Sequence, residues 1–326
     1  MEEQVFIITL GLLISRHHKA TPANLILFFN RNSVFNMGVK GLYSYLRPYR
    51  HPLDISTVSK GTIGIDALSI LYKFRGNTDM ILKFLEPFLS LGCTLLFVFD
   101  GKAPETKKEE VDTRKAKRNS ARDEALTLKT YLETTPQLTD NDRRVLERKI
   151  HSLEMGEGWY ITRCARHAFQ DVLRRNNIPF VKAIGEADDV LMSLWSDNKL
   201  ISIISSDMDF LVAGVERLWI PTVSGCEEIL LSTVIAKEEL TMSSFRDAAI
   251  LCGVSTGYVF SNMYPQKAFT FMRHYGSLEK LMERQPAHFN MDRPDTLAQI
   301  RGRFLIFVKA SELVRTEYRS NIINLF

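Results

Sequence analysis

The stretch TLLFVFD at residues 94–100 decides the fold. Six residues that favour strands, all apolar after the first, end at Asp100 and are followed by Gly101. A strand that is apolar at almost every position lies in a sheet covered on both faces. Similar runs occur at 62–66, 179–182 and 201–205, and helical patterns at 68–75, 80–91, 163–176 and 186–197 separate the four runs. Strands that alternate with helices predict an α/β fold: a mainly parallel central sheet with helices on both faces.

Composition excludes several classes of protein. The chain has 326 residues, 45% of them hydrophobic, and a net charge of +4. That apolar content is too high for a disordered chain, and no run reaches the roughly 18–20 apolar residues that a membrane span needs. We therefore expect no membrane partner. The cysteines are far apart and form no C-x-x-C motif, which argues against zinc and disulfides and favours an intracellular location; they are Cys93, Cys164, Cys226 and Cys252.

The first 36 residues differ from the rest in their pattern of apolar and polar residues. An apolar run at 5–14 is too short to span a bilayer, and it follows Glu2 and Glu3 where a secretory signal would carry basic residues. We expect translation to start at Met37 and the extension to be an upstream reading-frame artefact or a dispensable leader. A targeting segment is the alternative.

An inserted segment at about 101–159 has no strand character and is rich in charge. At helical spacing Lys107, Arg114, Arg118 and Arg122 share one side. This pattern fits a solvated charged helix as well as a helix that faces an anion over the sheet.

After Pro221 the pattern predicts a hairpin at about 226–235. Helical patterns follow at 243–252, 265–275, 277–283 and 294–316.

Acidic residues follow every predicted strand. In an open α/β sheet, ligands bind outside the carboxyl ends of the strands. A single acid there is usually a cap or a turn former, but several converging acids repel one another unless a cation lies among them. Oxygen ligands suit Mg²⁺ or Mn²⁺, and two such ions can hydrolyse a phosphodiester. The candidates are Asp66, Asp100, Glu186, Asp188, Asp207 and Asp209. The expected chemistry is metal-dependent phosphoryl transfer on nucleic acid.

Several blocks in a fixed order resemble the flap endonuclease family, the structure-specific 5′ nucleases of the XPG type. They are MGVKGLYSYL from Met37, GIDALSILY from Gly64, VFDGKAPETKKEEVDTRKAKR from Val98, ITRCARHAFQDVLRRNNIPFVKAIGEADD from Ile161 and SSDMDFL from Ser205. The resemblance runs to about Tyr275. It implies a PIN-like nuclease core, a helical arch as the insertion, and a C-terminal region like a helix-hairpin-helix.

The resemblance also implies roles for matching residues. The six acids match the family's metal ligands, although Asp188 is shorter than the usual Glu. Lys107 and Arg114 match the basic residues that contact the scissile phosphate, and Tyr72 matches the aromatic residue on which a base stacks. Gly38 matches a glycine near the DNA, which supports Met37 as the start.

Arg118, one helical turn beyond Arg114, is expected to bind substrate as well. Two departures concern duplex binding. Ser255 stands where the family has a seventh acid, and residues 262–268 lack both glycines of a hairpin that holds a potassium ion. We expect weaker binding of the downstream duplex and of the second metal, although Lys267 can still reach a phosphate. Residues 321–326 carry no sliding-clamp peptide. These features suggest a divergent member of the kind that a large DNA virus would encode.

The sequence therefore predicts a nuclease that uses Mg²⁺ (or Mn²⁺), with two ions, on flapped or branched DNA in replication, repair or recombination. A monomer acting in the nucleus or at sites of DNA replication is expected. The alternatives are a 5′→3′ exonuclease, a junction resolvase, or a DNA-binding relative without catalysis. The predicted regions are an extension at 1–36, an N-terminal nuclease region at 37–135, an internal region at 136–240 and a degenerate helix-hairpin-helix at 241–326.

Overall fold

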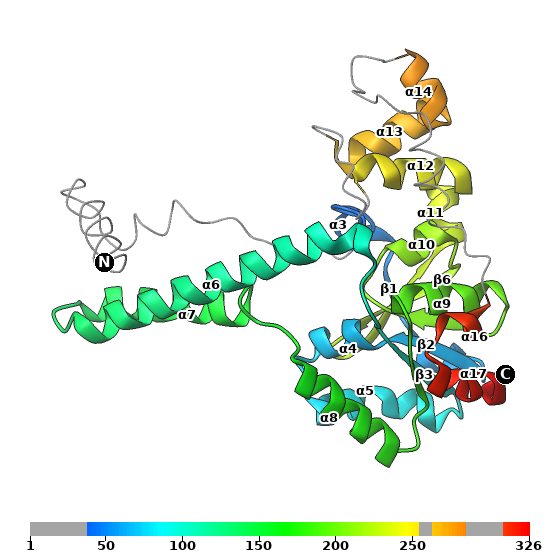
Figure 1. Ribbon diagram of the computed structural model, residues 1–326. Coiled ribbons are helices and arrows are strands. Elements are labelled where there is room, and N and C mark those ends of the chain that lie inside the picture. Colours follow the sequence, from blue (N-terminus) through cyan, green and yellow to red (C-terminus); the bar gives the residue numbers. More distant parts are fainter. Residues whose placement is uncertain (1–37, 254–262, 285–308) are drawn as a thin grey trace. The chain divides into compact units, whose positions relative to one another are not determined.

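The computed structural model describes residues 38–253, 263–284 and 309–326 (Figure 1). Its centre is a seven-stranded sheet in the order β1-β7-β6-β5-β2-β3-β4. The strands are β1 (His51–Pro52), β2 (Thr62–Asp66), β3 (Thr94–Phe99), β4 (Phe180–Lys182), β5 (Ser202–Ile204), β6 (Arg217–Thr222) and β7 (Gly225–Leu230).

The five strands from β6 to β4 are parallel, and β7 pairs antiparallel with both β6 and β1. The register is short but well defined. Asp66 pairs with Val98 across β2 and β3, and Lys182 of β4 lies opposite Phe99 of β3. The prediction of a mainly parallel sheet is confirmed.

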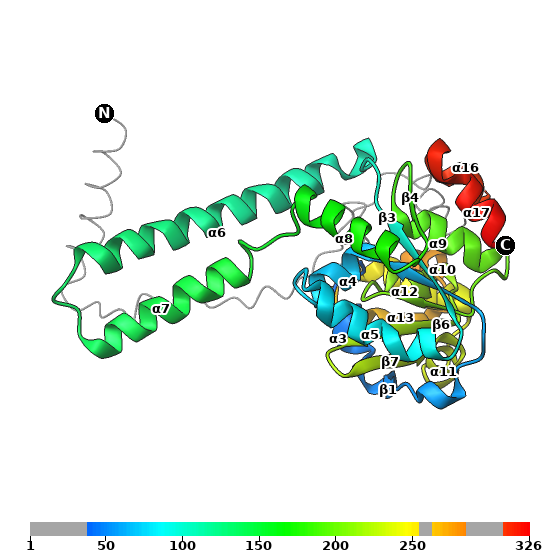
Figure 2. The same ribbon diagram turned by 90° about the horizontal axis from the view of Figure 1, so that it is seen from below.

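Helices cover both faces of this sheet (Figures 1 and 2). On one face, Phe169 of α8 packs on Phe97 with ring centroids 5.4 Å apart, and Phe88 of α5 stacks on Trp219 of β6 at 5.6 Å. On the other face, buried side chains of α9, α10 and α12 share one core with β3 and β4. The helices around the sheet are α3 (Leu42–Tyr45), α4 (Ala67–Lys73), α5 (Thr78–Ser90), α8 (Arg163–Arg175), α9 (Ala187–Ser196), α10 (Asp209–Ala213) and α11 (Leu231–Lys237).

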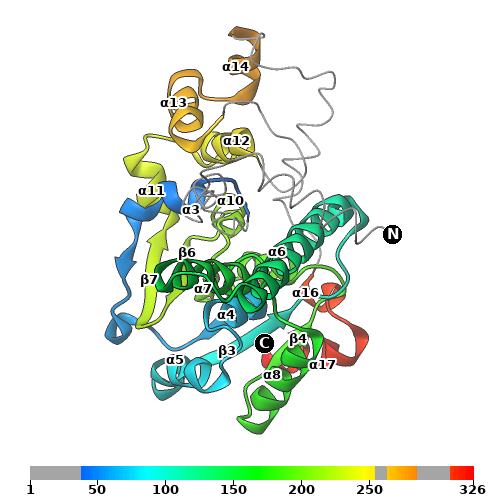
Figure 3. The same cartoon turned by 90° about the vertical axis from the view of Figure 1, so that its left-hand side faces the viewer.

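The chain continues as three helices after α11. They are α12 (Met242–Cys252), α13 (Pro265–Tyr275) and α14 (Leu278–Arg284), and Figure 3 shows them in succession beyond α10. The buried Asp247 of α12 accepts a hydrogen bond from the backbone N–H of Leu278 at 3.1 Å, which joins α12 to α14. Ser255, which lies between α12 and α13, is outside the described residues.

The insertion is a helical hairpin. It consists of α6 (Lys108–Thr134) and α7 (Asp140–Met155), and Val111–Trp159 forms a compact unit separate from the sheet. The helices lie side by side (Figure 2), with small and apolar residues buried between them: Ala121, Ala125, Leu146 and Ile150. Ion pairs join Lys129 to Glu154 at 2.6 Å and Lys149 to Glu124 at 3.4 Å. The prediction of a helical insertion is confirmed.

The last described segment covers the outer edge of β4. Ala183 forms an antiparallel bridge with Val314, and the N–H of Arg315 donates to the carbonyl of Lys182 at 3.0 Å. Tyr318 packs on Phe180 with ring centroids 5.8 Å apart. Two short helices, α16 (Ala310–Leu313) and α17 (Arg319–Leu325), complete this segment, so the backbone groups of β4 do not face solvent as an open edge.

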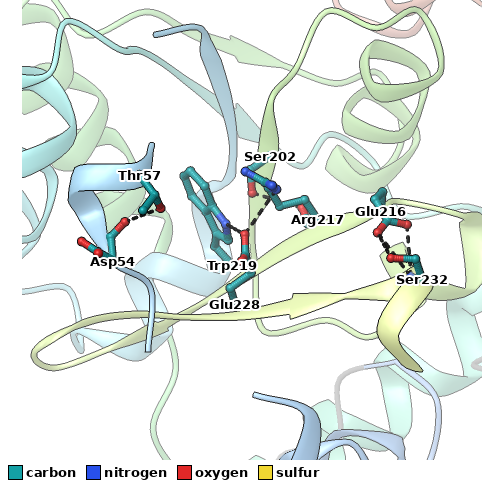
Figure 4. Close-up of polar contacts among 8 residues, drawn as sticks. All are labelled: Asp54, Thr57, Ser202, Glu216, Arg217, Trp219, Glu228 and Ser232. Atoms are coloured by element: carbon teal, nitrogen blue, oxygen red, sulfur yellow. Dashed lines mark hydrogen bonds and ion pairs between the residues drawn. The ribbon is translucent and has the colours of Figure 1, made fainter. Parts of the chain in front are cut away.

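One expectation was wrong. The sequence pattern places a hairpin at 226–235, whereas β6 and β7 form it at 217–230 and Leu231–Lys237 is helix α11. The N-cap residue of α11, Leu230, has no side chain that can accept a hydrogen bond, and Glu216, just before β6, takes this role. Its carboxylate accepts hydrogen bonds from the N–H and hydroxyl of Ser232 (Figure 4), and this partner is distant in sequence. Of the helical pattern at 294–316, residues 294–308 lie outside the described part.

Like Asp247, the buried carboxylate of Glu238 joins separate elements of the sheet domain. Glu238, directly after α11, accepts hydrogen bonds from the hydroxyls of Tyr45 at 2.8 Å and Tyr49 at 2.5 Å, and from Arg273 of α13 at 2.5 Å. We call these four residues the Glu238 cluster. The cluster fixes α13 to α3 and to the short 3₁₀ helix Arg47–Tyr49. None of the helices described is long and apolar enough to cross a membrane.

Candidate active site

The predicted acids lie at the carboxyl ends of four neighbouring strands, β5, β2, β3 and β4. Asp66 ends β2, and Asp100 directly follows β3. Between β2 and β5 the chain order of the strands reverses, which makes this edge the switch point where α/β sheets bind ligands. We call the six predicted acids the acid edge: Asp66, Asp100, Glu186, Asp188, Asp207 and Asp209.

Asp66 is held by three hydrogen bonds. Its Oδ1 accepts from the N–H groups of Leu68 at 3.0 Å and Ser69 at 3.2 Å, which caps α4, and its Oδ2 accepts from the hydroxyl of Ser205 at 3.0 Å. Burial nevertheless raises the pKa of Asp66 to about 7, and the charge of Asp100 adds to the rise. The same residue therefore caps a helix and belongs to an electrostatically crowded group.

Asp188 lies at the centre of this crowding. Burial raises its pKa well above the ordinary value, and the charges of four other acids raise it further: Asp207, Asp66, Asp100 and Asp209. The backbone N–H of Asp209 donates to Oδ1 of Asp207 at 2.9 Å, which fixes the turn that carries both acids. The fold thus brings five of the six predicted acids into mutual electrostatic reach, which is costly unless positive charge is supplied.

Glu186 is paired with a lysine. The Lys107 ammonium lies 2.6 Å from Glu186 Oε1, and both side chains are largely buried. Beside them, Asp100 accepts a hydrogen bond from the N–H of Ala187 at 2.8 Å. Burial raises the pKa of Asp100, while that hydrogen bond and the charges of Lys107 and Arg166 oppose the rise. Positive charge therefore reaches the acid edge at this end.

Gly38 lies directly against the acid edge. Its φ is +76°, a conformation that favours glycine. A Cβ atom at this position would lie 2.0 Å from Oδ1 of Asp207 and 2.8 Å from Oδ1 of Asp209. Any other residue would displace these carboxylates.

The chemistry of the donors fits a hard divalent cation. The six predicted ligands are carboxylates, which Mg²⁺ and Mn²⁺ prefer. In the described ranges, no three His, Cys, Asp or Glu side chains are drawn together tightly enough to enclose an ion. The raised pKa values of Asp66 and Asp188 nevertheless show that the site favours added positive charge. A cation bound among these carboxylates would offset their repulsion.

The other predicted residues are distributed over several elements. Tyr72 is half-buried in α4, one turn after Ser69. Lys267 lies in α13, with its ammonium 5.4 Å from the Phe271 ring. Arg114 and Arg118 lie on α6 within the helical-hairpin unit.

Serine hydroxyls around the acids were not predicted. Ser205 links two acids, because its hydroxyl donates to Asp66 and accepts from the N–H of Asp207 at 3.1 Å. The N–H of Ser206 donates to the hydroxyl of Ser69 at 2.8 Å, which ties β5 to α4. The pair of serines directly before Asp207 was the available signal, since hydroxyls there often bond the local backbone.

A parallel sheet with a row of crowded carboxylates at its switch point defines a class: an α/β protein with its acidic residues gathered at the carboxyl edge of the sheet. Residues 37–121 match the model of the XPG N-terminal domain, and residues 177–255 match that of the XPG I-region. Together these matches cover just over half of the chain, and the chain belongs to the XPG family.

Relatives with similar sequences agree with this assignment. The chain is 27% identical over 255 residues to flap endonuclease 1 of Zea mays, covering 75% of this chain and 60% of the relative. It is 24% identical over 307 residues to a probable RAD2-like endonuclease of Invertebrate iridescent virus 3, covering 75% and 81%. The chain therefore spans about 60% of the length of the plant relative.

Among solved structures, the catalytic core of Rad2 in complex with a DNA substrate has a TM-score of 0.54 at 18% identity, covering 88% of this chain and 80% of that one. Flap endonuclease-1 from Methanococcus jannaschii has a TM-score of 0.53 at 16% identity, with 80% and 84% covered. At these identities the similarity concerns the fold.

Proposed function

We propose that this protein is a Mg²⁺-dependent, structure-specific 5′ nuclease that hydrolyses phosphodiester bonds in flapped or branched DNA. The observation that carries the proposal is the group of buried, mutually repelling carboxylates at the switch point of the sheet. Perturbed titratable groups of this kind concentrate at functional sites. The endonucleases among its relatives, and the DNA complex of the similar Rad2 core, support DNA as the substrate.

The acid edge would hold the metal. Two Mg²⁺ ions, or Mn²⁺ in their place, would supply an activated water and stabilise the leaving oxygen. The carboxylates of Asp66, Asp188 and Asp207 would orient these ligand sites, with Ser205 fixing the positions of Asp66 and Asp207. Gly38 would leave open the space that a side chain would fill.

Basic and aromatic residues would bind the nucleic acid. Lys107 already lies at the acid edge, where its ammonium can neutralise charge on the phosphate that is cleaved. Arg114 and Arg118 of the helical hairpin would contact the same strand, Tyr72 would stack on a base, and Lys267 would contact the phosphate backbone of the duplex. We infer a monomer that acts where DNA is replicated and repaired, the nucleus in a eukaryotic cell.

A cleavage assay with matched variants tests the proposal. Purified protein is incubated with 5′-flap, nicked and four-way DNA in Mg²⁺, beside Asp207→Ala and a control, Asp171→Ala. Asp171 is an exposed acid of α8 that pairs with Arg174. Cleavage should fall by about a thousandfold or more in Asp207→Ala and stay within about twofold in the control. Tight DNA binding without cleavage by the unaltered protein, in both Mg²⁺ and Mn²⁺, would instead indicate a binding protein.

A further inference from the structure

Four basic side chains gather beside the Asp100 end of the acid edge. Lys182 ends β4, opposite Phe99 in the register, and Asp100 directly follows Phe99. The backbone of Arg315 is hydrogen-bonded to the carbonyl of Lys182 at 3.0 Å. The other two residues lie one helical turn apart at the start of α8. We call Arg163, Arg166, Lys182 and Arg315 the β4 basic cluster.

The packing of α8 directs these side chains toward one another. Phe169 of α8 packs on Phe99 at 6.2 Å between ring centroids, and Phe99 packs edge-on against Phe180 at 5.7 Å. Phe180 therefore points to the face of the sheet that α8 covers. Lys182 points to the same face, because residues two apart in a strand share a side.

The charges of the cluster act on one another. Burial lowers the pKa of Lys182, and the charges of Arg315, Arg166 and Arg163 lower it further, in that order; Glu317 is the acid that opposes them. The charge of Arg166 also acts on Asp100, where it opposes the rise in pKa that burial causes. The cluster is thus a concentration of positive charge that touches the acid edge at one end.

These cations differ from other arginines near the sheet. Arg174, Arg217 and Arg273 each form an ion pair with an acid. Within the described ranges, none of the four side chains of the cluster has a hydrogen bond or an ion pair. The Nε of Arg166 is shielded from solvent without an acceptor. A buried donor without an acceptor is costly, so such donors mark places where a ligand can complete the set.

We propose that the β4 basic cluster binds one phosphate group of the DNA backbone, next to the cleavage position on the β4 side of the acid edge. This inference rests on the proposed function. Guanidinium groups match the oxygen geometry of phosphate. Arg163 and Arg315 are exposed, and Arg166 and Lys182 are half-buried, so a bound phosphate would meet donors at different depths of the cluster. Six carboxylates repel a polyanion, and the cluster supplies attraction where the strand leaves them.

Equilibrium binding to 5′-flap DNA in EDTA, measured against salt concentration, tests this assignment. The variants Arg166→Gln, Lys182→Gln and Arg315→Gln are compared with Arg175→Gln, which removes the same charge from the opposite end of α8. Each cluster variant should raise Kd about three- to tenfold at 0.1 M salt and reduce the salt slope by roughly 0.7–0.9, the share of one phosphate. Arg175→Gln should change neither. Arg166→Lys should keep most of the slope, which separates loss of charge from loss of fold.

The outcomes distinguish this inference from the proposed function. If the unaltered protein cleaves flap DNA and all cluster variants bind it with unchanged Kd and slope, the phosphate site is wrong and the nuclease stands. If the unaltered protein neither binds nor cleaves DNA, both are wrong. Inorganic phosphate is the third arm. A thermal shift by phosphate that Arg166→Gln abolishes, with unchanged DNA binding, would assign the cluster to free phosphate and overturn the DNA assignment.

Discussion

The acid edge and the Glu238 cluster both contain buried carboxylates, but the charged groups around these carboxylates are opposite in sign. Asp66 and Asp209 are 6% and 7% exposed, and Glu238 is 5% exposed. Glu238 receives three donors, one of them the cation of Arg273. For Asp66 and Asp188, burial and the charges of other acids raise the pKa. A buried acid with complete partners stabilises the fold, whereas a group of acids that repel one another is suited to receive a cation.

The hydrogen bonds to Glu238 also affect the pKa values of the tyrosines that donate them. Burial, together with the hydrogen bond to Glu238, raises the pKa of Tyr49 to about 12, so its hydroxyl remains a donor at any physiological pH. The hydroxyl of Tyr49 therefore stays protonated in the neutral range. Asp66 of the acid edge differs, because its pKa is raised to about 7 and its carboxyl changes charge within that range.

The largest expected effect is on the cleavage rate, which should depend on the acid edge and not on the Glu238 cluster. Asp188→Asn should reduce the single-turnover rate of flap cleavage by about a thousandfold or more, roughly 4 kcal/mol, because the proposed central metal ligand is lost. Its melting temperature should stay the same or rise, since repulsion is removed. Glu238→Gln should leave the cleavage rate within a few-fold. An unchanged rate in Asp188→Asn would remove Asp188 from the catalytic group.

The second effect concerns stability. Glu238→Ala should lower the free energy of unfolding by about 3 kcal/mol, because it leaves Arg273 and two tyrosine hydroxyls without their acceptor. Urea denaturation measures this change. The control is Glu227→Ala, whose partly exposed carboxylate lies 3.8 Å from Arg50 and should contribute less than about 1 kcal/mol. Equal losses in the two variants would show that the Glu238 cluster does not join the helices as described.

A third, smaller effect is the pH dependence of the metal-free protein. Asp66 keeps its proton up to about pH 7 in the folded state, but only to about pH 4 when unfolded. The folded state therefore binds more protons between these values, and stability falls as pH rises through this window. Denaturation in EDTA at several pH values measures the slope. Asp66→Asn should flatten it and Mg²⁺ should offset it at pH 8; a stability that rises through this window would contradict the prediction.

The smallest expected effect is on metal affinity, and it concerns the Lys107–Glu186 pair at one end of the acid edge. The Lys107 ammonium lies 2.6 Å from Glu186. If Glu186 is a metal ligand, as proposed, Lys107 would compete with the metal for it. Lys107→Met should tighten Mn²⁺ binding in the absence of DNA by about fivefold, roughly 1 kcal/mol, and should slow cleavage at the same time. Calorimetric titration measures the affinity. The exposed neighbour provides the control, since Lys108→Met should change neither quantity; weaker Mn²⁺ binding in Lys107→Met would refute the competition.

The sequence predicted the parallel sheet because its strands carry their own signal. The run at 95–99 is apolar throughout, and both β2 and β3 end within one residue of an acid. The acids at the strand ends follow from the same pattern, since strand ends of a parallel sheet meet at one edge.

Contacts between distant segments were not predictable. Glu216 caps α11 from before β6, so the local sequence of 231–237, with its β-branched residues, predicted strand where packing of Leu231 and Val234 selects helix. The pairs Ser205–Asp66 and Lys107–Glu186 join residues 139 and 79 positions apart. Such pairs depend on the packed sheet rather than on any local pattern.

The position of Gly38 has a genetic consequence. Every missense change of a glycine codon introduces a side chain, and here that side chain would meet the Asp207 carboxylate. Position 38 lies at the margin of the fold rather than in a strand or helix. We therefore expect single-base mutations of this codon to yield protein of normal abundance without normal metal binding, alleles that compete with the active enzyme for the same DNA.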